Sequence, residues 1–154
     1  VLKDQNIPAI VSGTHTSPRR EDAAYDQPFR VPAELHEAGI LFSIANGDDT
    51  AHERNLPYSA ATAVAHGLPA DAAIKAITLD AAAILGVDDR LGSLEKDKAA
   101  TLIITDGSPL EVTTRIHHAF IDGREIDLTS KHDVLYQKYK ERYRQTGDLP
   151  RGKD

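Results

Sequence analysis

The chain has 154 residues, of which 40% are hydrophobic and 27% are charged, as in a soluble globular domain large enough to bury a core. Its formal net charge of −6 argues against a nucleic-acid-binding surface, which needs clustered lysine and arginine. No apolar run reaches the roughly 18 residues of a membrane span, and the lack of cysteine excludes disulfides, thiolate metal ligands and a cysteine nucleophile. We therefore predict neither nucleic acid nor membrane as a partner.

The first part of the chain alternates apolar runs with polar loops and helices. Residues 7 to 14 read IPAIVSGT and predict a buried strand, which a long charged loop over residues 15 to 30 follows. A short helix is expected to begin at Pro32 and to end at Gly39, ahead of a second strand over residues 40 to 45. This alternation is typical of α/β folds, in which loops at the carboxyl ends of parallel strands carry the working residues.

The rest of the chain divides into three stretches. Residues 57 to 85 are rich in alanine and predict helices, and short β runs follow, with an Asp-Gly hairpin signal at Ile121-Asp122-Gly123-Arg124. Ser130 and Asp133 form an N-terminal capping pattern ahead of a last helix. That helix carries an apolar stripe available for packing, made of Leu135, Tyr139 and Tyr143.

One long motif resembles a known family. Residues 77 to 110 read ITLDAAAILGVDDRLGSLEKDKAATLIITDGSPL, and they resemble the C-terminal signature of the amidohydrolase superfamily. The matching positions are Leu85-Gly86, Gly92-Ser93-Leu94-Glu95, Lys98 and Gly107-Ser108-Pro109-Leu110; Asp97 and Thr101 depart from the pattern. Residues 117 to 126 are similar to the strand pair that closes the family's β-sandwich. The imidazolonepropionase-like and prolidase-like branch is the most similar.

The resemblance implies an α/β fold, and it implies that this chain forms only part of a larger barrel. Residues 1–86 correspond to the last two βα units of a (β/α)8 TIM-like barrel, with strands seven and eight at residues 7 to 14 and 40 to 46. Residues 87–128 correspond to part of a small β-sandwich, and residues 129–154 form a C-terminal helix and tail. The implied partner is the missing N-terminal part of the barrel, so we expect any targeting signal to lie upstream of Val1. An incomplete barrel exposes strand edges, which favours self-association.

The resemblance also implies a chemistry. Family members hold one or two divalent metals, usually zinc, with histidines after strands one, five and six and an aspartate after strand eight. The metal lowers the pKa of a bound water, and the strand-eight aspartate acts as general base toward it. The implied substrate is a small-molecule amide, cyclic amide or dipeptide whose C–N bond is hydrolysed. Only the strand-eight aspartate belongs to this part of the family plan, so we expect the isolated chain to be inactive.

The candidate metal ligands follow the second strand. Counted without gaps from Ala38-Gly39, the family's aspartate falls on Gly47, with Asp48 and Asp49 one and two positions later. A one-residue bulge would bring Asp48 into place as metal ligand and general base, with Asp49 as a second possible ligand. The alternative is that these residues only form a turn. The Gly47 departure also leaves open a metal-free scaffold or binding protein.

Four further residues on the two loops are candidate substrate contacts: His15, His52, Arg54 and Asn55. A guanidinium suits bidentate binding of a carboxylate such as a dipeptide terminus, which favours Arg54. The alternatives are that His15 is an ordinary polar loop residue and that Arg54 and Asn55 only brace the start of the next helix.

Overall fold

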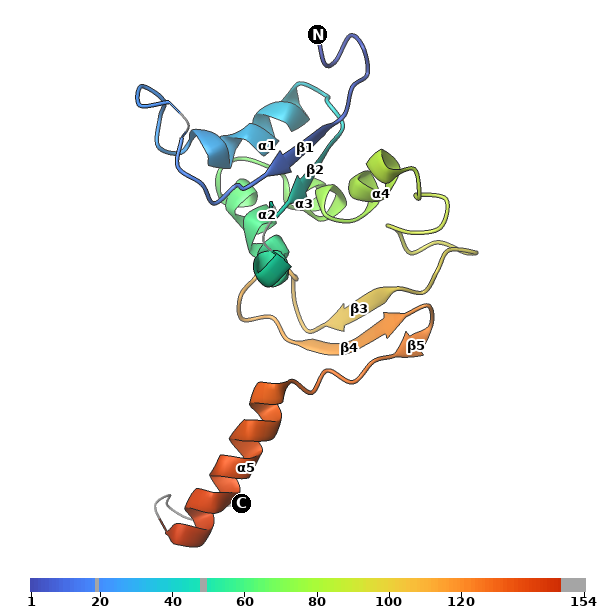
Figure 1. Ribbon diagram of the computed structural model, residues 1–154. Helices are drawn as coiled ribbons and strands as arrows, with labels where there is room; N and C mark the ends of the chain where they lie inside the picture. The colour runs from blue at the N-terminus through green and yellow to red at the C-terminus, as the bar shows by residue number, and fades with distance from the viewer. Residues whose placement is uncertain (19, 48–49, 148–154) are drawn as a thin grey trace.

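The computed structural model describes residues 1–18, 20–47 and 50–147, apart from the side chains of residues 50 and 51 (Figure 1). It confirms a mixed α/β fold. In chain order the elements are β1 (Ala9–Ser12), α1 (Gln27–Glu37), β2 (Phe42–Ala45), the 3-10 helix η1 (Thr50–Asn55), α2 (Leu56–Ala65), α3 (Ala70–Ala76), α4 (Leu79–Leu85), β3 (Leu102–Thr105), β4 (Ile116–Ile121), β5 (Arg124–Glu125) and α5 (Lys131–Thr146).

Strands β1 and β2 pair in parallel, as the βα alternation predicts. Ala9 lies opposite Phe42, and Ser12 lies opposite Ala45. A backbone bond from the Gly13 amide to the Ala45 carbonyl, at 3.2 Å, extends the pairing beyond the strands. Two parallel strands with helices on one side are consistent with part of a TIM barrel. Their assignment as the last two units remains a prediction.

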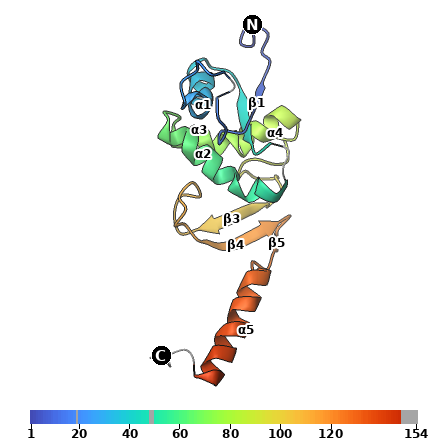
Figure 2. The same cartoon turned by 60° about the vertical axis from the view of Figure 1, so that its left-hand side comes forward.

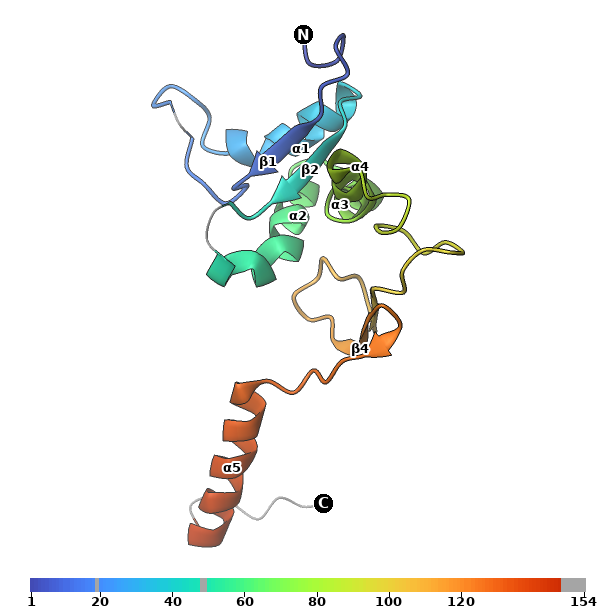
Figure 3. The ribbon, with the colours of Figure 1, turned by 45° about the vertical axis from the view of Figure 1, so that its right-hand side comes forward.

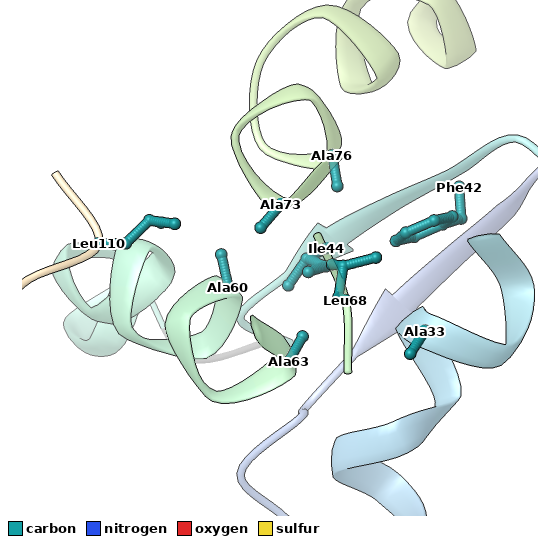
Figure 4. Close-up of a cluster of buried hydrophobic side chains, with 9 residues drawn as sticks. All are labelled: Ala33, Phe42, Ile44, Ala60, Ala63, Leu68, Ala73, Ala76 and Leu110. Atoms are coloured by element: carbon teal, nitrogen blue, oxygen red, sulfur yellow. The ribbon is translucent and has the colours of Figure 1, made fainter. Parts of the chain in front are cut away.

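The core lies between β2 and the helices that follow it. Phe42 and Ile44 of β2 are buried, and Figure 4 shows Ile44 and Leu68 among small side chains from the helices. The buried alanines of this cluster are Ala33, Ala60, Ala63, Ala73 and Ala76. Because alanine has a short side chain, the helices approach the strand closely, and the aliphatic packing fixes α2 against the end of β2.

Helix α1 begins earlier than the sequence predicts. It starts at Gln27 rather than at Pro32, which lies inside the helix. Pro28 occupies the first turn, where a missing N–H is tolerated. The extra turn is held by packing, because the rings of Phe29 and His66 lie 5.1 Å apart between centroids and the Pro32 side chain is fully buried. The predicted end is confirmed, since Gly39 follows the helix with a φ of 67°.

Strands β3, β4 and β5 form a separate antiparallel sheet between the α/β layer and α5 (Figure 2). The predicted hairpin is confirmed: Asp122 and Gly123 join β4 to β5 with φ angles of 48° and 76°. Two positive φ angles define the turn that matches the natural twist of paired strands. The loop before β4 returns to the α/β layer, where Leu110 is buried in the core cluster.

Helix α5 projects away from the other elements (Figures 1 and 3). Its predicted cap is confirmed, because the Asp133 amide donates to Ser130 Oγ at 3.2 Å and the Ser130 amide donates to Asp133 Oδ2 at 2.8 Å. The apolar stripe, however, stays largely uncovered by the part of the chain that the structure describes: Leu135, Tyr139 and Tyr143 are 37%, 47% and 46% exposed. Among the helices of the described ranges, none is both long and apolar enough to cross a membrane.

Candidate functional site at the ends of the parallel strands

The carboxyl ends of β1 and β2 lie beside α2 (Figure 3). We call this region the strand-end rim: residues 13–15 after β1, residues 46–47 after β2, and the facing turns of α2 at residues 58–62. The first contact in it is buried, because the fully buried Thr14 donates its hydroxyl to the Ser59 carbonyl at 3.3 Å. The loops after β1 and β2 are distant in sequence, but both form hydrogen bonds to α2 in the rim.

Asn46 is one of several rim residues that the sequence did not single out. Its side-chain amide donates to the His52 carbonyl at 2.6 Å, and its side-chain oxygen accepts from Ser59 Oγ at 2.7 Å. One side chain thus closes the loop after β2 onto η1 and ties both to α2. The available signal was an amide side chain directly after a buried apolar strand, although asparagine at such a position is also an ordinary turn residue.

His15 lies on the rim, as its position after the first strand predicts. Its Nε2 atom lies 2.6 Å from Thr62 Oγ1, and that hydroxyl lies 3.0 Å from the Tyr58 carbonyl one turn earlier in α2. The imidazole is exposed, so one ring nitrogen is held by the helix while the ring borders solvent. His15 is therefore anchored by α2 within an otherwise polar loop.

The loop after β2 carries the other candidates. Gly47 has a φ of 69°, and a Cβ there would meet no atom of the described residues within 4 Å. Asp48 and Asp49, the predicted metal ligands, lie outside the described residues. His52 and Arg54 belong to η1 and are exposed. Within the described ranges, Arg54 makes no hydrogen bond or ion pair, which leaves its guanidinium available to an anion.

Asn55 precedes α2 at its N-cap position, but its side chain makes no capping hydrogen bond. The alternative that this residue braces the helix start through a cap is therefore not seen in the geometry. The substrate-binding roles of His15, His52, Arg54 and Asn55 remain predictions.

The residues of the described ranges do not hold a metal ion by themselves, since no three histidine or acidic side chains among them gather at one point. Two histidine–carboxylate pairs occur outside the rim, on or next to the strands of the antiparallel sheet. His117 Nε2 lies 3.4 Å from Asp106, and His118 Nδ1 lies 2.6 Å from Glu125. Each pair has a single carboxylate. A hydrogen bond from the Arg115 amide is the main cause that holds the pKa of the Asp106 carboxyl below its usual value.

The sequence matches the Amidohydrolase family over residues 18–131, so the chain belongs to this family. It is similar to the crystal structure of an amidohydrolase from Thermotoga maritima MSB8, with 26% identity, a TM-score of 0.71, and coverage of 82% of this chain and 33% of that one. It is also similar to a zinc-bound adenosine deaminase from Xanthomonas campestris, with 24% identity, a TM-score of 0.49, and coverage of 74% and 34%. No curated protein matches the chain. The chain thus spans about a third of the length of both structures.

Proposed function

We propose that this chain is part of a metal-dependent amidohydrolase that hydrolyses the C–N bond of a small amide, a cyclic amide or a dipeptide. The observation that supports it most is the family match, which includes the loop between Pro18 and α1 and the whole of β2, η1 and α2. In this proposal the other barrel strands and most metal ligands belong to the remainder of the protein. The isolated chain is inactive because it lacks them.

The chain's own residues bind and orient the substrate. Arg54 receives a carboxylate, since its guanidinium offers a planar pair of donors. His15, His52 and Asn55 contact the substrate's polar groups. Asp48 is the proposed general base and metal ligand, with Asp49 as the second ligand. A divalent metal, which we propose to be zinc, supplies a water of lowered pKa when it is bound by the complete protein. Because the described residues do not form its site alone, we assign no step of the reaction to it here.

Zinc titration by calorimetry tests whether most metal ligands belong to the rest of the protein. The full-length protein should bind zinc with a defined stoichiometry and hydrolyse amides, and the 154-residue chain should do neither. Tight stoichiometric zinc binding by the isolated chain would contradict the proposal.

The substrate branch is a finer part of the proposal: we place the protein near the imidazolonepropionase-like and prolidase-like enzymes. For a dipeptide substrate, Arg54→Ala should raise KM at least about tenfold, because a charge-assisted bidentate pair contributes about 1.5–3 kcal/mol. The matched comparison is the same dipeptide with an amidated C-terminus, whose KM should change little. An equal increase in KM for both substrates would show that Arg54 does not bind the substrate carboxylate.

The Gly47 departure favours one alternative, a metal-free relative that retains the barrel as a scaffold or binding protein. Metal analysis of the purified full-length protein separates the two. A folded protein that binds no zinc in titration and hydrolyses no amide would support the scaffold, and a zinc-loaded, active protein would exclude it.

A further inference from the structure

The hydrogen bonds around Thr62 determine which nitrogen of His15 carries the proton. A backbone carbonyl only accepts hydrogen bonds, and a threonine hydroxyl has one hydrogen to donate. At 3.0 Å from the Tyr58 carbonyl, that hydrogen is directed at the helix backbone. The 2.6 Å contact between Thr62 Oγ1 and His15 Nε2 is then a hydrogen bond only if Nε2 carries a proton and the hydroxyl oxygen accepts it.

The opposite arrangement leaves the network with a repulsive contact. If Thr62 donated to Nε2 instead, its oxygen lone pairs would face the lone pairs of the Tyr58 carbonyl at 3.0 Å. One assignment satisfies all three groups and the other does not. The tautomer of a histidine follows from the hydrogen bond that one of its nitrogens makes.

We propose that Thr62 is a positioning residue that holds neutral His15 with its proton on Nε2, so that Nδ1 presents a lone pair at the strand-end rim. Within the described residues Nδ1 has no hydrogen-bond partner. This deepens the proposed function and rests on it for the identity of the ligand. The group bound at Nδ1 is a hydrogen-bond donor of the substrate, such as an amide N–H or an ammonium group, and not a carboxylate.

The attachment to α2 is what makes His15 more than a loop residue. Ser59 and Thr62 lie three positions apart on α2 and so on the same face of the helix. The backbone carbonyl of Ser59 accepts the hydrogen bond of the Thr14 hydroxyl, and the side-chain oxygen of Thr62 contacts the imidazole of His15. Two successive bonds to a helix packed in the core therefore restrict both the place and the rotation of the imidazole.

Two-bond ¹⁵N–¹H correlation spectra of the chain at alkaline pH, where imidazoles are neutral, measure the tautomer directly. The His15 signals are assigned by their loss in His15→Gln. The proposal expects a protonated Nε2 and an unprotonated Nδ1 in the unaltered chain. A protonated Nδ1 there would overturn it, whether or not any variant folds.

Variants then test the role of Thr62. Thr62→Val removes the hydroxyl at nearly constant shape and should turn His15 into a mixture of tautomers, whereas Thr62→Ser should retain the single form. The matched control is Thr78→Val. The Thr78 hydroxyl likewise donates to a carbonyl one helical turn earlier, that of Ile74 at 2.7 Å, but it contacts no histidine in the described part of the chain. An unchanged tautomer in Thr62→Val would refute the positioning role.

In the full-length enzyme, Thr62→Val should raise KM several-fold for a substrate whose amide carries N–H and much less for its N-methylated counterpart. Equal effects on the two substrates would overturn the assignment of a donor ligand. If the full-length protein hydrolyses no amide while His15 shows the expected tautomer, the proposed function fails and the assignment of the proton stands, so the two failures are distinguishable.

Discussion

Gly92 lies where the chain after α4 turns back against that helix. A Cβ at this position would lie 2.8 Å from the Ala82 Cβ and 2.9 Å from the Leu79 Cα, and the backbone φ is 91°. Both the close approach and the positive φ require glycine. Gly92 opens the Gly-Ser-Leu-Glu part of the family motif, so at least this position of the motif has a packing reason.

Gly92→Ala should therefore destabilise the chain more than Gly47→Ala. Both substitutions place a side chain at positive φ, at a cost of about 1–2 kcal/mol. Only the first also forces a methyl group into backbone atoms, which adds about 1–3 kcal/mol. Urea unfolding of the two variants measures the difference, and equal losses would show that α4 moves aside at no cost.

Asn46 gives a second prediction at the scale of single residues. Asn46→Ala removes the hydrogen bonds that the Asn46 side chain makes to the Ser59 hydroxyl and to the His52 carbonyl, so the free energy of unfolding should fall by about 1–3 kcal/mol. Asn55→Ala is the matched control, because the Asn55 side chain caps no helix end. A similar loss in both variants would mean that the Asn46 bonds do not stabilise the loop.

The candidate site could be predicted from the sequence only where position along a strand was sufficient. His15 was found because it follows an apolar run, and the structure attaches it to α2. Asn46 was missed because its partners, His52 and Ser59, lie 6 and 13 residues away and are set by how α2 packs. Hydrogen bonds that cross between elements depend on tertiary packing and leave no periodic trace in the sequence.

At the scale of elements, boundaries set by a local residue preference were predicted correctly, and the one start that was wrong depended on a choice between two prolines. Helices α1 and α4 end where Gly39 and Gly86 adopt positive φ, as expected of glycine beyond a last helical turn. The start of α1 was wrong because a proline was read as a first-turn residue when Pro28 already filled that role. The cap of α5 was right because Ser130 and Asp133 satisfy each other locally.

The cap of α5 should make its helix content depend on pH. Hydrogen bonds from Ser130 hold the pKa of the Asp133 carboxyl below its ordinary value. A lowered folded-state pKa means that the stabilisation is present above the unfolded-state pKa and is lost as the pH falls through the folded-state pKa. Asp133→Asn should thus reduce helix content at neutral pH, and the difference from the unaltered chain should shrink in acid.

Far-ultraviolet circular dichroism measures this helix content. Asp127→Asn is the control, because Thr129 also lowers the pKa of the Asp127 carboxyl but Asp127 lies outside α5. A loss of helix in the Asp127 variant, or a loss in the Asp133 variant that persists unchanged in acid, would argue against the cap as its cause.

At the scale of the whole molecule, the α/β layer has an open side. The only strand pair of this layer, within the described ranges, is β1 with β2, and Ile10 in the middle of β1 is 59% exposed. Unpaired strand edges and exposed apolar side chains favour association. We propose that the isolated chain self-associates through this side when the rest of the barrel is not there to cover it.

Ile10→Lys should shift the chain toward monomer, because a charge on an exposed strand opposes edge pairing. Val112→Lys is the comparison: Val112 is still more exposed, at 75%, but lies in the loop before β4. Light scattering over a range of concentrations measures the mass. A monodisperse monomer of the unaltered chain would rule out self-association, and an equal response to both lysines would place it elsewhere.

Helix α2 makes the two rim loops interdependent. Thr14 and His15 from one loop and Asn46 from the other all end on Ser59 or Thr62. A foreign loop grafted in place of either one would meet the same groups on the helix: the backbone carbonyl of Ser59, its hydroxyl and the hydroxyl of Thr62. A shift of α2 that accommodates one new loop would therefore displace the groups that the other loop binds. A library designed to change the specificity of the rim would therefore vary both loops together with positions 59 and 62 of α2.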